Sequence, residues 1–182
     1  MAAERRAFFK VLSVGMTGFA SLITSRAGTA QDAKQARTGV SFRRLCVTAS
    51  DLERSVKFYT EAFGFAPDAR PGTLKGPQMS AITELTDVDA TWRLLDMGGG
   101  DQLQLYGFAN PKVIGDGKRK PMNNLGLCLL SLWVSDMSAT LAAVRKAGGT
   151  VLEEARIGPA GPPIATMVLD PDGTRIELVK RS

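Results

Sequence analysis

The chain contains no histidine among its 182 residues. Imidazole is the commonest ligand for transition metals and the commonest general base near neutral pH, so the usual form of either chemistry is excluded. Cysteine is also scarce, with two residues, and aromatic residues make up 7% of the chain. Hydrophobic residues reach 44%, which is enough for one globular domain with a real core.

A strong charge of one sign is also lacking once the N-terminus is set aside. The formal net charge is +5, but four of the 23 basic residues and one of the 18 acidic residues lie within residues 1–30. The remainder carries 19 basic and 17 acidic residues, a net of +2. Bulk charge therefore gives no reason to expect a nucleic-acid partner.

The first 30 residues resemble a bacterial twin-arginine export signal. Arg5 and Arg6 are followed by two phenylalanines and a lysine, and the apolar run from Val11 to Ile23 is too short to span a bilayer comfortably. Small residues before Ala30 predict cleavage after it, and polar residues 31–39 predict a tether. We expect a periplasmic or secreted protein with no stable membrane anchor after cleavage; a retained N-terminal anchor is the alternative.

The residues that follow predict a strand, a helix and further strands. Val40–Thr48 alternates as a strand does, and Ser50 to Glu53 is a capping box that opens a helix ending at Gly64. Prolines and glycines interrupt residues 65–90, so any strand there is expected to be irregular. Two clearer strands follow, Thr91–Met97 and Gln102–Tyr106, before a linker at residues 110–125.

The second half repeats this order. Gly126–Val134 predicts a strand, Ser135 and Asp136 open a helix, and strands are predicted from Thr150, over Ile164–Leu169 and over Thr174–Val179. The last two are joined by a tight turn, Asp170-Pro171-Asp172-Gly173. We therefore predict an α+β fold of two βαβββ modules, residues 40–109 and 126–181, forming a half-open concave sheet.

These motifs resemble the vicinal oxygen chelate superfamily, which includes glyoxalase I, extradiol dioxygenases and bleomycin-resistance proteins. The resemblance rests on Thr48 to Tyr59 with Phe63-Gly64, on Val134 to Asp136 with Ala147 to Leu152, and on Asp170 to Gly173 with Ile176 to Leu178. It covers residues 40–181. It implies the fold strongly and the reaction weakly, since one fold hosts many chemistries.

The resemblance also implies four metal-ligand positions, two in each module. In this chain they are occupied by Arg44, Gln104, Leu129 and Glu177. A divalent cation needs several hard oxygen or imidazole donors, whereas leucine donates nothing and arginine repels a cation. We therefore predict no metal and no other cofactor, and we disfavour a metalloenzyme that uses other ligands.

Strand alternation places these positions on one inner face. We predict that Arg44 and Glu177 converge there as an ion pair in place of the metal. The expected ligand pocket is lined by Phe42, Cys46, Gln104, Tyr106, Ser131 and Trp133. Two alternatives stay open: the pair is a silent buried pair, and Tyr106 and Trp133 are core residues rather than a stacking surface.

Cys46 is expected to face the pocket and Cys128 the helix side, which argues against a disulfide between them. Without a histidine to activate it, Cys46 is interpreted as a packing residue.

The preferred function is an exported glyoxalase-like protein that binds a small organic ligand, aromatic or anionic, without catalysis. The alternative is a metal-independent lyase or isomerase, with Glu177 as the candidate catalytic residue acting with Arg44 or Tyr106. The resemblance implies paired modules that form one cavity per chain or pair across a homodimer, and the sequence leaves both arrangements open.

Overall fold

Two consecutive modules make up the described chain, which comprises residues 39–118, 121–158 and 160–181 of a computed structural model. The predicted signal peptide (1–30) and the tether up to residue 38 lie outside these residues. Residues 42–182 form one compact unit. Within the described ranges, no helix is long and apolar enough to cross a membrane.

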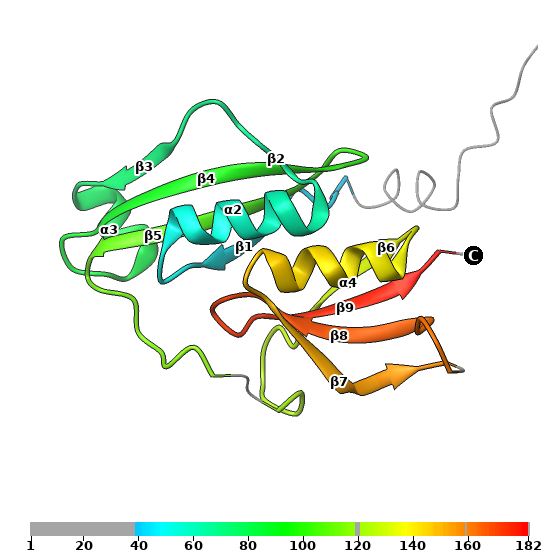
Figure 1. Ribbon diagram of the computed structural model, residues 1–182. Helices are drawn as coiled ribbons and strands as arrows, with labels where there is room; N and C mark the ends of the chain where they lie inside the picture. Colours follow the sequence, from blue (N-terminus) through cyan, green and yellow to red (C-terminus); the bar gives the residue numbers. More distant parts are fainter. Residues whose placement is uncertain (1–38, 119–120, 159, 182) are drawn as a thin grey trace, which may run out of the picture. The chain divides into compact units, whose positions relative to one another are not determined.

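The first module contains one long helix and the strands of a mixed sheet (Figure 1). Its elements in chain order are β1 (Leu45–Thr48), α2 (Leu52–Phe63), β2 (Ala66–Pro67), β3 (Gly72–Lys75), α3 (Pro77–Thr83), β4 (Asp89–Gly98) and β5 (Asp101–Asn110). The strand order is β1-β5-β4-β2, with β3 also paired to β4. The irregular strand expected before residue 90 is therefore two short strands followed by a short helix.

The second module repeats the order with fewer interruptions. Its elements are β6 (Leu130–Val134), α4 (Met137–Lys146), β7 (Thr150–Ile157), β8 (Ala165–Leu169) and β9 (Arg175–Lys180). The strands form a second sheet in the order β6-β9-β8-β7. The first and last strands of each module pair in parallel, and the other strand pairs are antiparallel. The predicted α+β fold of two βαβββ modules is confirmed.

Both long helices begin at an aspartate. The side chain of Asp51 accepts a hydrogen bond from the Arg54 N–H at 3.0 Å, and that of Asp136 accepts one from the Ala139 N–H at 2.9 Å. Each bond satisfies a backbone donor that the first turn of a helix leaves unpaired. Helix α2 ends at Gly64, whose φ of 71° lies in the left-handed region.

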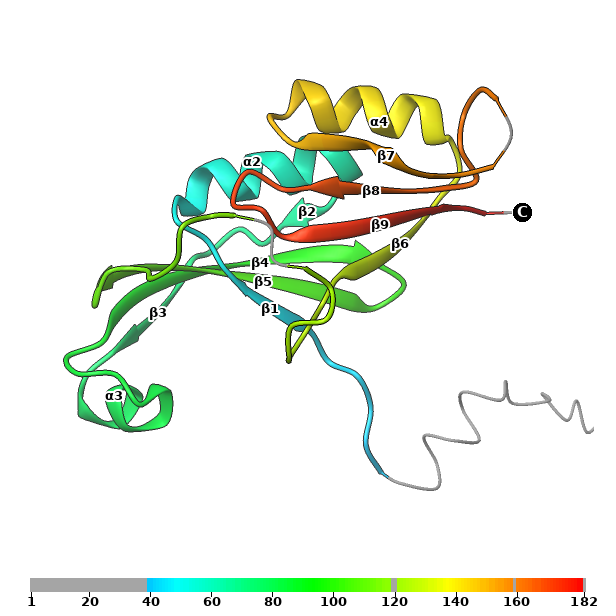
Figure 2. The ribbon, with the colours of Figure 1, turned by 90° about the horizontal axis from the view of Figure 1, so that it is seen from below.

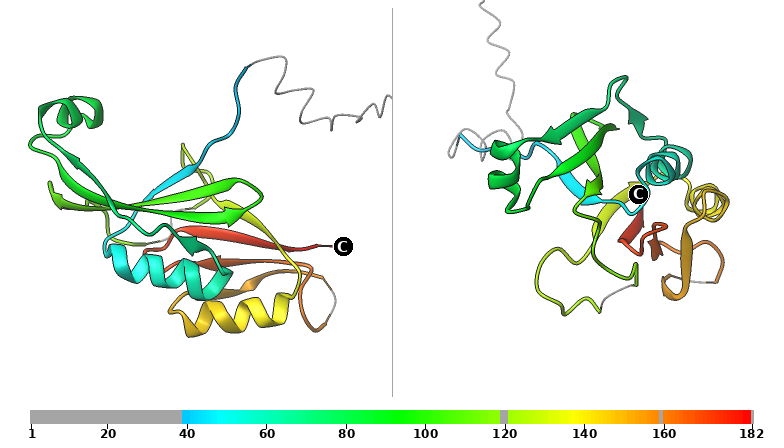
Figure 3. Two further views of the ribbon diagram at one scale, coloured as in Figure 1. Left: turned by 90° about the horizontal axis from the view of Figure 1, so that it is seen from above. Right: turned by 90° about the vertical axis from the view of Figure 1, so that its left-hand side faces the viewer.

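The hydrophobic core lies where the two helices meet the two sheets. Helices α2 and α4 lie side by side on the same side of both sheets (Figures 2 and 3). Fully buried side chains come from both modules: Phe58, Tyr59, Leu95, Leu103, Leu105, Met137, Val144, Val168, Ile176 and Leu178. Because both modules contribute to one core, they stabilise each other.

Two bridging contacts fix the second module to helix α2. The Tyr59 hydroxyl donates a hydrogen bond to the Asp170 carboxylate at 2.9 Å. Asp172 accepts hydrogen bonds from the Ser50 N–H at 2.9 Å and from the Arg54 guanidinium at 2.5 Å. The predicted Asp170–Gly173 turn therefore also serves as the anchor of one module on the other.

Candidate functional site

The predicted site residues lie on the sheet faces that point away from the helices. In the first sheet, Cys46 pairs with Gln104, whereas the neighbouring Leu103 and Leu105 point into the core. In the second sheet, Ser131 pairs with Glu177, whereas Ile176 and Leu178 point into the core. The alternation predicted from the sequence is therefore present in both sheets.

Arg44 precedes β1 and lies over the first sheet. Its guanidinium donates a hydrogen bond to the side-chain oxygen of Gln104 at 2.5 Å. Gln104 is 4% exposed, and its oxygen is also 3.9 Å from the Cys46 sulfur. Arg44 itself is half-buried, its Nε is buried without a hydrogen-bond partner, and it forms no ion pair with a described residue.

Glu177 has a different partner from the one predicted. Its carboxylate accepts a hydrogen bond from the Ser131 hydroxyl at 2.6 Å, and its side chain is half-buried. The predicted Arg44–Glu177 ion pair was therefore wrong. Glu177 bonds to Ser131, its register partner across β6 and β9, whereas Arg44 bonds to Gln104, which is the register partner of Cys46 two residues further along the chain. The two side chains therefore lie with different sheets.

The aromatic residues of the predicted pocket differ in burial. Tyr106 is half-buried, and its ring lies 6.2 Å from that of Phe108 at a tilted angle. Burial raises the pKa of Tyr106, the neighbouring Cys46 adds to this increase, and the positive charge of Arg44 opposes it. Trp133 is 67% exposed and so is Phe42, so neither is a core residue.

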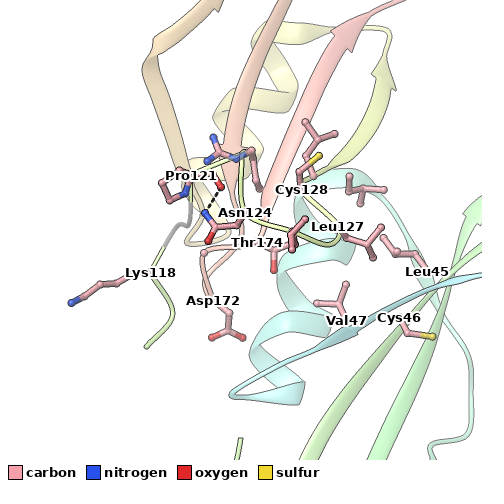
Figure 4. A pocket seen from close by; sticks show the side chains of 15 residues that line it. Leu45, Cys46, Val47, Lys118, Pro121, Asn124, Leu127, Cys128, Asp172 and Thr174 are labelled. Atoms are coloured by element: carbon pink, nitrogen blue, oxygen red, sulfur yellow. Dashed lines mark hydrogen bonds between the residues drawn. The ribbon is translucent and has the colours of Figure 1, made fainter. Parts of the chain in front are cut away.

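Three of the predicted site residues line two different cavities. The first, of about 350 Å³, lies between β1, residues 121–130 and the Asp172–Arg175 segment, and Cys46 lines it (Figure 4). The second, of about 530 Å³, lies between the β4–β5 turn and β6, and Ser131 and Trp133 line it. Arg44, Gln104, Tyr106 and Glu177 line neither of these two cavities.

Both cysteines are free and exposed, as the predicted lack of a disulfide requires. They nevertheless line the same cavity, because residues 121–129 do not continue β6 and curve towards β1 (Figure 4). Lys118 lines it as well, and its ammonium group is 3.8 Å from Asp116. Residues 119 and 120, which are also basic, lie outside the described residues.

The four positions implied for a metal do not form a suitable donor set. Leu129 has no donor atom, Arg44 is cationic, and Gln104 already accepts a hydrogen bond from Arg44. Only Glu177 supplies a carboxylate. In the described part of the chain, no group of three or more histidine, cysteine, aspartate or glutamate side chains is placed to hold a metal ion.

A family model and a curated relative both associate the chain with glyoxalase-type proteins. The model of the Glyoxalase/Bleomycin resistance protein/Dioxygenase superfamily matches residues 41–178. A curated relative from Vibrio parahaemolyticus, named probable lactoylglutathione lyase, is 31% identical over 130 residues, covering 71% of this chain and 83% of that protein.

Solved structures of low sequence identity share the fold. A glyoxalase family protein from Bacillus cereus superimposes with a TM-score of 0.66 at 18% identity, covering 78% of this chain and 93% of that one. The trypanothione-dependent glyoxalase I of Leishmania major superimposes with a TM-score of 0.53 at 22% identity, covering 78% and 86%.

Proposed function

Because the chain belongs to the Glyoxalase/Bleomycin resistance protein/Dioxygenase superfamily, we propose that it binds a small organic anion on the inner face of its first sheet. The observation that carries this proposal is the state of Arg44. Its guanidinium is half-buried, its Nε has no hydrogen-bond partner, and no described carboxylate neutralises it. A ligand carboxylate would supply both the missing acceptor and the missing charge.

The cost of leaving Arg44 in this state supports a binding role. A buried polar group without a partner costs roughly 1–3 kcal/mol, and charged groups cost more. Buried cations are therefore normally paired within the protein. Gln104 orients the guanidinium at 2.5 Å without neutralising it, because an amide carries no net charge.

The neighbours of Arg44 favour an anion with an aromatic or apolar body. Tyr106 pairs with Trp92 across β4 and β5, so both rings lie on the same face of the sheet. Phe108 lies beside Tyr106. Half-buried aromatic rings next to a guanidinium are typical of sites that bind aromatic carboxylates by stacking and a two-pronged hydrogen bond.

The catalytic alternative is a metal-independent lyase or isomerase that uses Glu177. The name of the relative from Vibrio parahaemolyticus, probable lactoylglutathione lyase, is the reason to test it. The arrangement of the side chains favours binding, because Glu177 bonds to Ser131 while Arg44 and Tyr106 lie on the other sheet. A lactoylglutathione lyase assay, with and without added divalent metals, separates the two roles.

The binding role is tested with a matched pair of arginine variants. Arg44→Gln removes the proposed anchor, whereas Arg43→Gln removes a neighbouring exposed charge. Aromatic carboxylates and the corresponding amides are screened by thermal shift and then titrated by calorimetry. A charge-assisted hydrogen bond contributes about 1.5–3 kcal/mol, so Arg44→Gln should weaken carboxylate binding roughly 10- to 100-fold. Equal losses in the two variants, or equal affinity for acid and amide, would contradict the proposal.

We also propose that the protein acts outside the cytoplasmic membrane after removal of residues 1–30. The paired arginines and the short apolar run support this location. Replacing Arg5 and Arg6 by lysine should retain the full-length chain in the cytoplasm, as measured by cell fractionation and N-terminal sequencing. Light scattering of the mature protein distinguishes a monomer from the homodimer that the sequence leaves open.

A further inference from the structure

A separate cavity lies on the helix side of the second module. It has a volume of about 240 Å³ and is bounded by α4, β7, β8 and residues 161–163. Helix α4 covers this face of β7 and β8 in Figure 2. Thr166, which lines the cavity, pairs with Leu178, whereas Glu177 points to the opposite face of the sheet. The cavity is therefore distinct from the proposed Arg44 site.

An irregularity in β7 shapes this cavity. Leu152 pairs with Met167, and the next pair is Arg156 with Thr166, so residues 153–155 have no counterpart on β8. Extra residues of this kind bend a strand and redirect its side chains, and they are frequent beside functional sites. Here the bulge places Glu153 and Arg156 at the cavity wall.

The floor of the cavity holds an unsatisfied hydroxyl. Thr166 is 2% exposed, and its Oγ1 has no hydrogen-bond partner. Most buried side-chain hydroxyls are paired, and an unpaired one calls for a physical explanation. A polar ligand atom in the cavity would supply the missing partner.

Among the described charges around the cavity, one cation has no counterion. Arg145 is paired with Glu153 at 2.5 Å. Arg156 donates a hydrogen bond to the Gly161 carbonyl and forms no ion pair with a described residue. The rest of the wall is mainly apolar, from Leu141, Val151, Pro162 and Pro163, with the Ser138 hydroxyl at one side.

We propose that this cavity is a second ligand site, for a small monocarboxylate with a short apolar body. The carboxylate is bound by the Arg156 guanidinium and by the Thr166 hydroxyl, and the alkyl part lies against Leu141 and Val151. Among the described residues, Arg156 alone at this cavity has no counterion, so a monoanion would be neutralised there, whereas phosphate would carry a second negative charge into a mainly apolar cavity. The cavity volume admits a chain of only a few carbons.

The test uses butyrate as the probe, titrated by NMR or calorimetry against the mature chain from residue 31 onward. Thr166→Val and Arg156→Gln should each weaken butyrate binding roughly tenfold, whereas Thr166→Ser, which keeps the hydroxyl, should retain it. Thr60→Val is the matched control, because Thr60 also has a buried hydroxyl without a partner but lies outside this cavity. Arg44→Gln removes the proposed anion site on the first sheet, so the butyrate binding that persists in this variant belongs to the Thr166 cavity.

Several outcomes would overturn the proposal. They are the lack of saturable butyrate binding, equal binding of butyramide, tighter binding of inorganic phosphate, or equal effects of Thr166→Val and Thr60→Val. If Arg156→Gln lowers the thermal midpoint substantially, Arg156→Lys replaces it and should bind butyrate more tightly than Thr166→Val does. This proposal is tested by Thr166→Val and Arg156→Gln with butyrate, whereas the proposed function is tested by Arg44→Gln with aromatic carboxylates. Failure of one proposal is therefore distinguishable from failure of the other.

Discussion

Replacing Tyr59 by phenylalanine removes one buried hydroxyl from the contact between the two modules. In the native protein this hydroxyl donates to Oδ2 of Asp170 at 2.9 Å, while Oδ1 accepts from the Asp172 and Thr174 N–H groups at 2.9 and 2.7 Å. Tyr59 is 0% exposed and Asp170 is 4% exposed. The variant therefore leaves Oδ2 without its donor in a site that water scarcely reaches.

The expected loss of stability follows from this geometry. Hydrogen bonds to charged groups contribute roughly 1.5–3 kcal/mol, and a buried acceptor left unpaired falls at the upper part of that range. We expect Tyr59→Phe to lower the free energy of unfolding by about 2–3 kcal/mol near neutral pH. For a domain of this size, that corresponds to a fall in the thermal midpoint of roughly 5–10 °C.

The effect should depend on pH in a defined direction. Burial raises the pKa of Asp170 above the ordinary value of an aspartate, and the hydrogen bonds from Thr174, Tyr59 and Asp172 oppose that increase. A carboxyl with a raised pKa stabilises the fold most below the unfolded pKa, and this contribution is lost as pH rises through the folded pKa. Loss of the Tyr59 donor raises the pKa of Asp170 further, so the substitution should cost more near neutral pH than in acid.

Urea unfolding followed by the fluorescence of Trp92 and Trp133 measures this difference at about pH 7 and about pH 3.5, on either side of the ordinary aspartate pKa. Tyr106→Phe is the matched control, because Tyr106 is half-buried and lies on the face of the first sheet that points away from helix α2. A cost below about 0.5 kcal/mol at neutral pH, well under the value of an ordinary charged hydrogen bond, would refute the reasoning. So would an equal cost at both pH values.

Three further changes have expected effects on the free energy of unfolding, each measured by urea denaturation. Gly149→Ala places a methyl group 2.6 Å from the Phe58 ring and should cost about 1–3 kcal/mol; a neutral effect would show that this contact is loose. Asp136→Ala removes the cap that accepts from Ala139 and should cost about 1 kcal/mol, and no loss would mean that water replaces the cap. Thr166→Val removes an unsatisfied buried hydroxyl and should stabilise the carboxylate-free protein by about 1 kcal/mol, whereas destabilisation would show that the hydroxyl is already satisfied.

Local signals in the sequence predicted most of the fold. The capping aspartates, the glycine that ends α2 and the Asp170–Gly173 turn each act within a few residues, so the sequence specifies them directly. Strand ends depend on distant partners. The predicted strand Gly126–Val134 begins only at Leu130, because its parallel partner β9 begins at Arg175 and the preceding residues of that segment form the turn. The predicted strand from Val40 similarly begins at Leu45, opposite a β5 that starts at Asp101.

The contacts of the candidate site were less predictable for the same reason. Alternation identifies the face on which Arg44 and Glu177 lie, but it does not show that Glu177 bonds to its register partner Ser131 or that Arg44 reaches Gln104, the register partner of Cys46. The cavity beside α4 and β7 depends on a shift of strand register in β7, and no local signal in residues 153–155 predicts that shift. Register, rather than composition, decides both sites.

Among the described contacts, the carboxylates that anchor the two modules to each other come from the second module. Asp170 and Asp172 reach the first module from the β8–β9 turn, whereas the corresponding β4–β5 turn consists of glycines and carries no such carboxylates. The two halves of the duplication have thus become complementary rather than equivalent. An isolated first half would expose the buried Tyr59, and two copies of that half could not replace the carboxylates it requires.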